Sequence, residues 1–194
     1  MDDCILMVDN GFFKLVKRYF EEKDRKRYRL LQSFRNICEN KKLNLKHLYF
    51  YWAPPFQSRV PTSDEKLKRK KYDLLKKMLD KKSWVTFREG RCQRIFSENG
   101  KPVFSQKGVD SWIVADMCLF KEDFPDISKN VLISSDSDFA PIIKLIKDRM
   151  KIEVILYTYF DKDRKGKFHR SNHLLSVVSI WKKLKEEYFE DAKI

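Results

Sequence analysis

The sequence has 194 residues and a formal net charge of +14, from 42 Lys and Arg against 28 Asp and Glu. A chain of this length is expected to form a single domain, residues 1–194, whose core needs no disulfide or structural metal. Hydrophobic residues make up 42% of the sequence, which excludes wholesale disorder, and 5 Gly with 6 Pro exclude a collagen-like or linker-like chain. The composition therefore predicts a basic globular domain.

The expected elements of the first half alternate between short apolar runs and helical patterns. They are a strand at 4–8, helices at 12–19 and 29–39, a strand at 47–53, a helix at 64–82, a strand at 84–87, and a hairpin of 91–96 with 103–105. The hairpin is expected because Asn-Gly lies between its two runs. The helix at 64–82 combines an apolar stripe with basic residues on its remaining surface.

The second half continues the same alternation. The expected elements are a helix at 109–120, a strand at 131–133, a helix at 139–150, a strand at 152–159 and a last, C-terminal helix from about 174 to 189. Strands that alternate with helices of this length predict the α/β fold class, with a mainly parallel central sheet and helices on both faces.

No segment of the sequence indicates a membrane or secretory protein. The apolar run at 4–8 is far shorter than the ~20 residues of a spanning helix, and the opening Met-Asp-Asp is acidic where a signal peptide is basic. Four cysteines stand singly, namely Cys4, Cys38, Cys92 and Cys118. We therefore expect reduced thiols packed in the core of a cytoplasmic protein that has no membrane partner.

The positive charge predicts an anionic partner and is concentrated in two segments. Residues 64–82 hold nine Lys or Arg against four Asp or Glu, and residues 161–170 hold five against two. Nucleic acid is the usual partner of such surfaces, because neutralising phosphates releases condensed counterions. The alternative is a solvated basic face that serves solubility alone.

Carboxylates follow the predicted strands, at the edge where open parallel sheets bind their ligands. Asp9 follows the first strand, Asp136 and Asp138 follow the strand at 131–133, and Asp110 opens a helix. Clustered carboxylates repel one another unless a cation neutralises them, and Mg²⁺ and Mn²⁺ prefer oxygen ligands. Taken singly, each acid also fits a helix cap or a turn, and Asp116 fits a solvated helix position.

Three motifs resemble those of the NYN (LabA-like) family of PIN-like nucleases. They are Val-Asp-Asn-Gly at 8–11, Lys-Gly-Val-Asp at 107–110 with Asp116 beyond it, and Ser-Ser-Asp-Ser-Asp-Phe at 134–139. The basic helix around 68–77 and the Gly90-Arg91 segment resemble that family as well. The likeness runs in order from residue 4 to about 181. It implies a three-layer PIN-like α/β domain and a ribonuclease that depends on Mg²⁺ or Mn²⁺.

The resemblance also implies which acids form the site. Carried over residue by residue, Asp9, Asp110, Asp136 and Asp138 are the catalytic and metal-binding acids, and Asp116 is a weaker metal candidate. The chain departs from the family pattern at Asn10, which directly follows the first acid, and at Ser135, where many members have Gly. We expect Asp9 and Asp136 to contact metal directly, with Asp110 and Asp138 completing or orienting the shell.

Residues expected to contact nucleic acid lie beside these acids or in the basic segments. They are Asn10, Lys107, Lys68, Arg69, Lys70, Arg91, Arg164, Lys165, Lys167 and Arg170. Tyr51, Trp52 and Phe56 are candidate stacking surfaces for unpaired bases, and core packing is expected of at least one of them.

The sequence thus predicts a metal-dependent ribonuclease that acts on single-stranded or structured RNA. Three alternatives stay open: a non-catalytic RNA-binding module, a DNA-directed PIN-like nuclease, and a protein-interaction role. A homo-oligomer is also left open, because the aromatic-rich C-terminal helix can pack internally or against a second copy.

Overall fold

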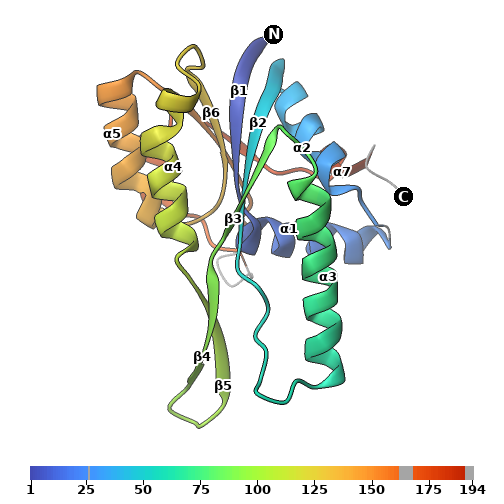
Figure 1. The fold of residues 1–194 in the computed structure, drawn as a ribbon. Coiled ribbons are helices and arrows are strands. Elements are labelled where there is room, and N and C mark those ends of the chain that lie inside the picture. The colour runs from blue at the N-terminus through green and yellow to red at the C-terminus, as the bar shows by residue number, and fades with distance from the viewer. Residues whose placement is uncertain (26, 162–167, 191–194) are drawn as a thin grey trace.

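A six-stranded parallel sheet organises the chain in the computed structural model, which describes residues 1–25, 27–161 and 168–190 (Figure 1). The strands are β1 (Asp2–Asp9), β2 (Leu43–Trp52), β3 (Val85–Glu89), β6 (Lys129–Ile133), β7 (Glu153–Thr158) and β8 (Ile180–Lys183). Their order across the sheet is β3-β2-β1-β6-β7-β8, and every neighbouring pair is parallel. All six carboxyl ends therefore lie at the same edge.

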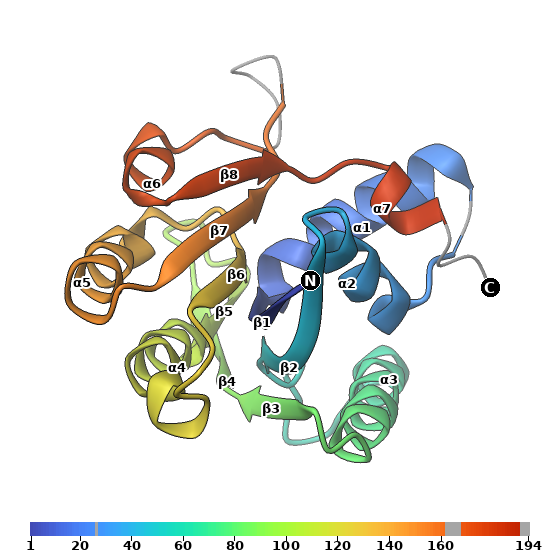
Figure 2. The same ribbon diagram turned by 90° about the horizontal axis from the view of Figure 1, so that it is seen from above.

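Helices cover both faces of this sheet, which confirms the predicted three-layer α/β fold (Figure 2). One side carries α1 (Asn10–Asp24), α2 (Leu30–Glu39), α3 (Ser63–Asp80) and α7 (Glu187–Glu190). The other side carries α4 (Val109–Asp123), α5 (Ala140–Met150) and α6 (Asn172–Val177).

Strand β1 lies between two hydrophobic cores, which explains its uninterrupted apolar sequence. Leu6 and Val8 pack in the core that holds α1 and α2, and Ile5 and Met7 pack in the core that holds α4 and α5. Full burial of one such side chain stabilises the fold by roughly 1.5–3 kcal/mol. Because Asp9 ends this strand, the packing of β1 fixes where its carboxylate lies.

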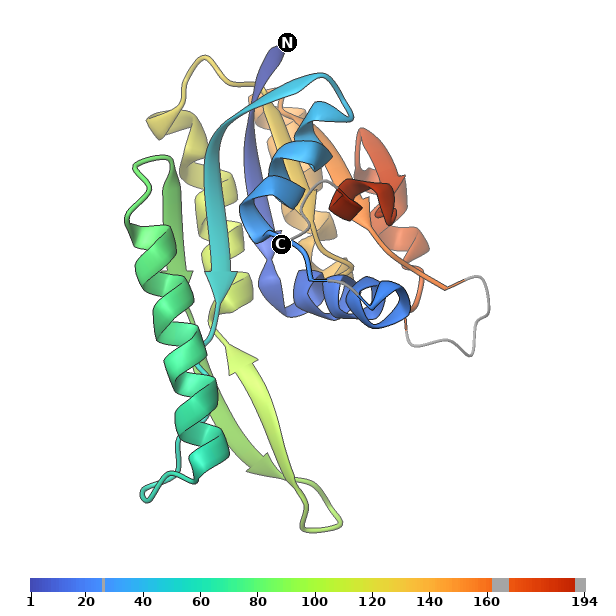
Figure 3. The same cartoon turned by 90° about the vertical axis from the view of Figure 1, so that its right-hand side faces the viewer.

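A separate antiparallel hairpin, β4 (Arg91–Phe96) with β5 (Pro102–Lys107), extends beyond the carboxyl edge of the sheet. It runs alongside the N-terminal half of α3, and both extend beyond the sheet in the same direction (Figure 3). We call the hairpin and this half of α3 the two prongs. The predicted Asn-Gly turn is present, with Gly100 at φ +69°, in the left-handed region that favours glycine. The hairpin therefore places a second surface next to the edge where the acids lie.

The predicted continuous helix at 174–189 is wrong. Helix α6 ends at Val177, and the chain then forms β8, which pairs Ile180 with Ile155 of β7. Two causes favour the strand: β-branched side chains at Val177, Val178 and Ile180, and the hydrogen-bonding edge that β7 would otherwise expose. Beyond β8 the chain crosses to the other core, where Tyr188 is buried.

The four cysteines differ in their burial. All four cysteines are free, but only Cys4 and Cys38 are buried, while Cys92 is partly buried and Cys118 is exposed. The expectation of four core thiols is therefore wrong for two of them. In the part of the chain that the structure describes, no helix combines the length and the apolar character needed to cross a membrane.

Candidate active site

The carboxylate of Asp9 is held at the junction of β1 and α1. Its Oδ1 accepts a hydrogen bond from the backbone N–H of Phe12 at 3.3 Å, which caps the helix. Its Oδ2 accepts a hydrogen bond from Ser134 Oγ at 3.0 Å. A Cβ added at Gly11 would lie 3.1 Å from Asp9 Oδ1, so glycine leaves room beside the carboxylate.

Ser134 connects Asp9 to the other acids of the sheet edge. It is fully buried directly after β6, and its Oγ also accepts a hydrogen bond from the backbone N–H of Asp136 at 3.2 Å. Asp136 in turn caps a short 3₁₀ turn, η1 (Ser137–Phe139), through a 2.9 Å hydrogen bond from Asp138 N to its Oδ1. A continuous chain of hydrogen bonds therefore runs from Asp9 to Asp138.

The role of Ser134 was missed from the sequence, although one signal was present. Val8 pairs with Ile133 in neighbouring strands, so the residues that follow them are adjacent at the sheet edge. A hydroxyl residue directly after the strand beside β1 is therefore in place to bind the carboxylate that ends β1.

Asp110, in the first turn of α4, completes this acidic edge. Burial raises the pKa of Asp9, and the charge of Asp110 raises it further, while the hydrogen bonds from Phe12 and Ser134 oppose the rise. Desolvation likewise raises the pKa of Asp110, with Asp136 and Asp138 adding to the rise and Lys107 opposing it. Asp110 thus lies near enough to Asp9, Asp136 and Asp138 to interact with the charge of each.

The donor set of this edge fits a hard divalent cation. All four acids offer carboxylate oxygens, which Mg²⁺ and Mn²⁺ prefer, and bound positive charge would offset the burial and the neighbouring charges that raise the pKa of Asp9 and Asp110. As the side chains stand, no group of three or more His, Cys, Asp or Glu among the described residues is close enough to hold a metal ion.

Asp116, the weaker metal candidate, has a different partner. It is buried on α4, and both of its carboxylate oxygens accept hydrogen bonds from Arg88, at 2.7 and 3.0 Å. This contact also raises the pKa of Arg88, whose guanidinium lies 4.9 Å from the centre of the Trp112 ring. The ion pair fastens α4 to β3.

Among the predicted nucleic-acid contacts, three lie close to the acids. Lys107 ends β5 and opposes the pKa rise of Asp110, and Arg91 is its direct partner across the hairpin. Asn10 is buried and lines a groove of about 820 Å³ together with Lys14 and Lys17 of α1.

The other predicted contacts are paired with other side chains, exposed, or outside the described residues. On α3, Lys68 forms an ion pair with Asp64, Arg69 forms one with Asp73, and Lys70 is exposed. The Arg170 guanidinium lies against the rings of Phe160 and Trp181. Arg164, Lys165 and Lys167 fall outside the described residues.

Tyr51 is the ring that packs in the core, because it is fully buried beneath α4 and is not available for stacking. Trp52 and Phe56 are partly exposed and stay available for stacking.

Fold and family together define the class of protein. The sequence matches the NYN domain over residues 9–176, which confirms the expected resemblance. NYN domains fall within the PIN-like nuclease superfamily, whose members typically use divalent metal ions. This chain belongs to the NYN domain family.

Comparison with other proteins adds support for the fold alone. The chain is similar to the crystal structure of a protein of unknown function from Vibrio parahaemolyticus RIMD 2210633, with 18% sequence identity and a TM-score of 0.52. The similarity covers 100% of this chain and 96% of that chain. No curated protein matches the sequence.

Removing the charge of Asp110 from the acidic edge should change the free energy of unfolding. Asp110→Asn should raise the free energy of unfolding of the metal-free protein at pH 7 by a few tenths of a kcal/mol, since solvent screens this exposed side chain. A raised pKa in the fold means that the stability contributed by the protonated acids is complete below about pH 3.8 and is lost as pH rises through the folded pKa values. The gain should therefore vanish near pH 4.

Urea unfolding in EDTA at pH 7 and pH 4 tests this expectation, with the exposed Asp126→Asn as the matched control. A gain of equal size at both pH values, or a loss of stability at pH 7, would contradict it.

The ion pair between Arg88 and Asp116 gives a second prediction. Arg88→Ala leaves a buried carboxylate without its cation and should cost about 3–5 kcal/mol of stability. Adding Asp116→Asn should recover part of this loss. Differential scanning calorimetry of the three variants measures both effects. Mn²⁺ should raise the Tm of the parent protein, and Asp116→Asn should keep this rise, whereas its loss would assign Asp116 to the metal.

Proposed function

We propose that the protein is a Mg²⁺- or Mn²⁺-dependent ribonuclease that hydrolyses RNA phosphodiester bonds at the carboxyl edge of its sheet. The observation that carries this proposal is the hydrogen-bonded chain from Asp9 through Ser134 to Asp136 and Asp138, with Asp110 close enough to raise the pKa of Asp9. Membership of the NYN family supports a nuclease, and a net charge of +14 supports a nucleic-acid substrate.

The four acids would hold the metal, with Asp9 and Asp136 in direct contact and Asp110 with Asp138 completing the shell. A bound divalent ion supplies a more acidic water and neutralises charge on the phosphate. Ser134 fixes the orientation of the Asp9 carboxylate and the position of the Asp136 backbone, so that little reorganisation is needed.

The cations near the site would bind and orient the RNA backbone. Lys107, whose charge opposes the pKa rise of Asp110, would contact the phosphate next to the acids, and Arg91 would extend this charge along the base of the hairpin. Hydrolysis joins the water oxygen to phosphorus and breaks the bond to the 3′ oxygen, which leaves a 5′-phosphate and a 3′-hydroxyl.

Two further parts of the proposal concern organisation and location. The continuous sheet, with one hydrophobic core on each face, supports a single domain over residues 1–194. The four free thiols suit a reducing compartment, which supports a cytoplasmic location.

Cleavage of an end-labelled single-stranded RNA tests the proposed reaction. The parent protein should cut in Mn²⁺ or Mg²⁺ and not in EDTA. Asp136→Asn should lower the rate by at least about 10²-fold, because the site loses a charge that binds metal. RNA affinity measured in EDTA should change less than about twofold, and the control Asp126→Asn should cut normally.

Each contrary result has a distinct meaning. Full activity of Asp136→Asn would remove this acid from the catalytic site. Binding without cutting, across RNA and DNA substrates, would favour a non-catalytic module, and preferential cutting of matched DNA would favour a DNA-directed nuclease.

A further inference from the structure

The β4–β5 hairpin has two faces of different character. Residues that pair directly across an antiparallel ladder share a face, and successive residues alternate between faces. One face, which we call the inner face, carries Cys92, Arg94, Phe96, Pro102, Phe104 and Gln106. The opposite, outer face carries the apolar pair Ile95 and Val103.

The inner face borders a groove toward α1 and α3. The groove has a volume of about 260 Å³, and Phe104 and Gln106 form its hairpin side. Its other side includes Trp52 and Phe56 from the end of β2 and the following loop, and Lys68 from α3. Aromatic and cationic side chains therefore face each other across it.

Exposed rings and a guanidinium are grouped at the outer end of the groove. Phe96 and Phe104 are 64% and 54% exposed, although large aromatic side chains are usually buried. The Phe56 ring centre lies 5.2 Å from that of Phe104. The Arg94 guanidinium lies 4.8 Å from the Phe56 ring centre and 5.4 Å from that of Phe96. Aromatic rings and guanidinium planes of this kind stack unpaired nucleobases.

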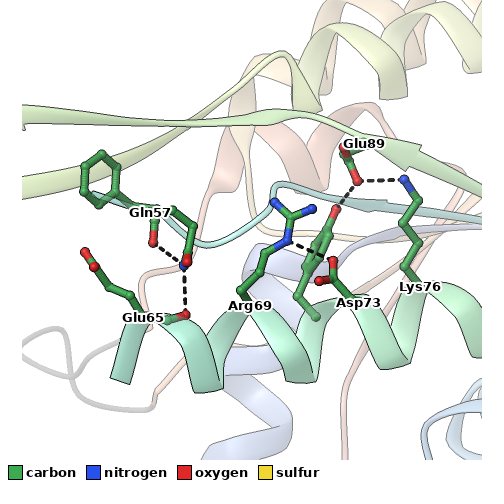
Figure 4. A network of polar contacts seen from close by, with 8 residues as sticks. Gln57, Glu65, Arg69, Asp73, Lys76 and Glu89 are labelled. Carbon is green, nitrogen blue, oxygen red and sulfur yellow. Dashed lines mark hydrogen bonds and ion pairs between the residues drawn. The ribbon is translucent and has the colours of Figure 1, made fainter. Parts of the chain in front are cut away.

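The loop that carries Phe56 is fastened to α3, as Figure 4 shows. The side-chain amide of Gln57 donates to the carbonyl oxygens of Phe56 and Glu65, each at 2.8 Å. Farther along α3, Tyr72 and Lys76 both donate to the carboxylate of Glu89, at 2.7 and 2.8 Å. The backbone at Phe56 is thus held against α3 before a strand binds, which lowers the entropic cost of ordering this loop on binding.

The inner end of the groove reaches the proposed catalytic edge. Gln106 Oε1 accepts a hydrogen bond from the backbone N–H of Ala53 at 3.3 Å. A Cβ added at Gly11 would lie 3.3 Å from Gln106 Nε2 and 3.1 Å from Asp9 Oδ1, so Gln106 and Asp9 flank the same point. A strand bound along the inner face would therefore lead to the acids.

The groove also contains a cation that lies among other cations. Lys14 is exposed, and its ammonium group lies 5.1 Å from the centre of the Trp52 ring. Desolvation lowers the pKa of Lys14, and so do the charges of Arg18, Lys68 and Lys71. A phosphate bound here would neutralise repulsion between these side chains.

We propose that the inner face is a base-stacking platform for unpaired RNA, which guides a strand toward Asp9 and makes the enzyme select single-stranded substrate. This inference rests on the proposed function for the identity of the polymer. At about 3.4 Å per residue, Phe96 lies about 14 Å along the strands from Gln106. Stacked nucleotides rise by about 3.4 Å each, so the platform spans about four nucleotides. A duplex hides the base faces that the rings would contact.

Charge favours RNA over a second copy of the chain as the occupant of the platform. The hairpin, residues 91–107, carries four Lys or Arg and one Glu, and the whole chain has a net charge of +14. Two such positively charged surfaces would repel each other, whereas the negative phosphate backbone of RNA would be attracted to the hairpin and to the rest of the chain.

Fluorescence anisotropy in EDTA tests the platform without requiring cleavage. The probes are a labelled 12-nucleotide single-stranded RNA and the same strand in a blunt duplex. The parent protein should bind the single strand at least tenfold more tightly than the duplex. Phe96→Ala with Phe104→Ala should weaken single-strand binding at least tenfold. The matched outer-face control, Ile95→Ala with Val103→Ala, should change it less than about twofold.

Loss of binding counts only if the variant is folded, which near-unchanged Tm and circular dichroism would show because both rings are exposed. Equal binding of duplex and single strand, or equal effects of the two double variants, would overturn the inference. The inference would also be overturned if light scattering showed that the parent protein is a dimer and that the inner-face variant, Phe96→Ala with Phe104→Ala, is a monomer.

Cleavage in Mn²⁺ separates the two proposals. A parent protein that binds as expected but never cuts leaves the platform intact and refutes the nuclease. A parent protein that cuts while the inner-face variant binds normally refutes only the platform.

Discussion

Burial of carboxylates beside one another at one edge of a parallel sheet is the constraint on which the rest of the site depends. The packing of β1 in two cores fixes Asp9 at that edge, and the parallel pairing of β1 with β6 brings Ser134 and Asp136 beside it. Hydrogen bonds from Ser134 and from the first turn of α1 hold the Asp9 carboxylate but leave its pKa raised. Protein groups thus orient the acids without neutralising them, an arrangement that suits the proposed binding of a cation.

The same chain neutralises another buried acid fully, and the contrast is informative. Asp116 has both oxygens bound by Arg88 and links α4 to β3. At the acidic edge the opposing cation is Lys107. Its charge opposes the rise in the pKa of Asp110, but it forms no ion pair among the described residues. A protein with 42 Lys and Arg has enough cations to neutralise the edge acids. Their placement on the hairpin, α1 and α3 instead surrounds the edge with positive charge, which suits a long polyanion that enters between the two prongs.

Local patterns in the sequence were sufficient to predict most of the fold and the position of the four acids near the carboxyl edge of the sheet. The buried run of β1, the Asn-Gly turn of the hairpin and the acids after apolar strands are all local signals. The C-terminal segment was mispredicted because the edge of β7, which local patterns cannot reveal, pairs with the residues after α6 as β8. Ser134 and the partner of Asp116 were missed because both depend on contacts between elements far apart in the sequence. Gln106 was missed for the same reason, since its contact with Ala53 needs the hairpin to fold back onto the end of β2.

The most direct test of a metal-binding acidic edge is a crystal structure of the protein soaked in Mn²⁺, with anomalous diffraction recorded near the manganese edge. An anomalous peak with carboxylate oxygens of Asp9 and Asp136 within about 2.5 Å, and with Asp110 and Asp138 beside it, is the predicted result. The same soak of Asp136→Asn should give a much weaker peak. A well-occupied manganese ion elsewhere, with no peak between these acids, would contradict the proposed site.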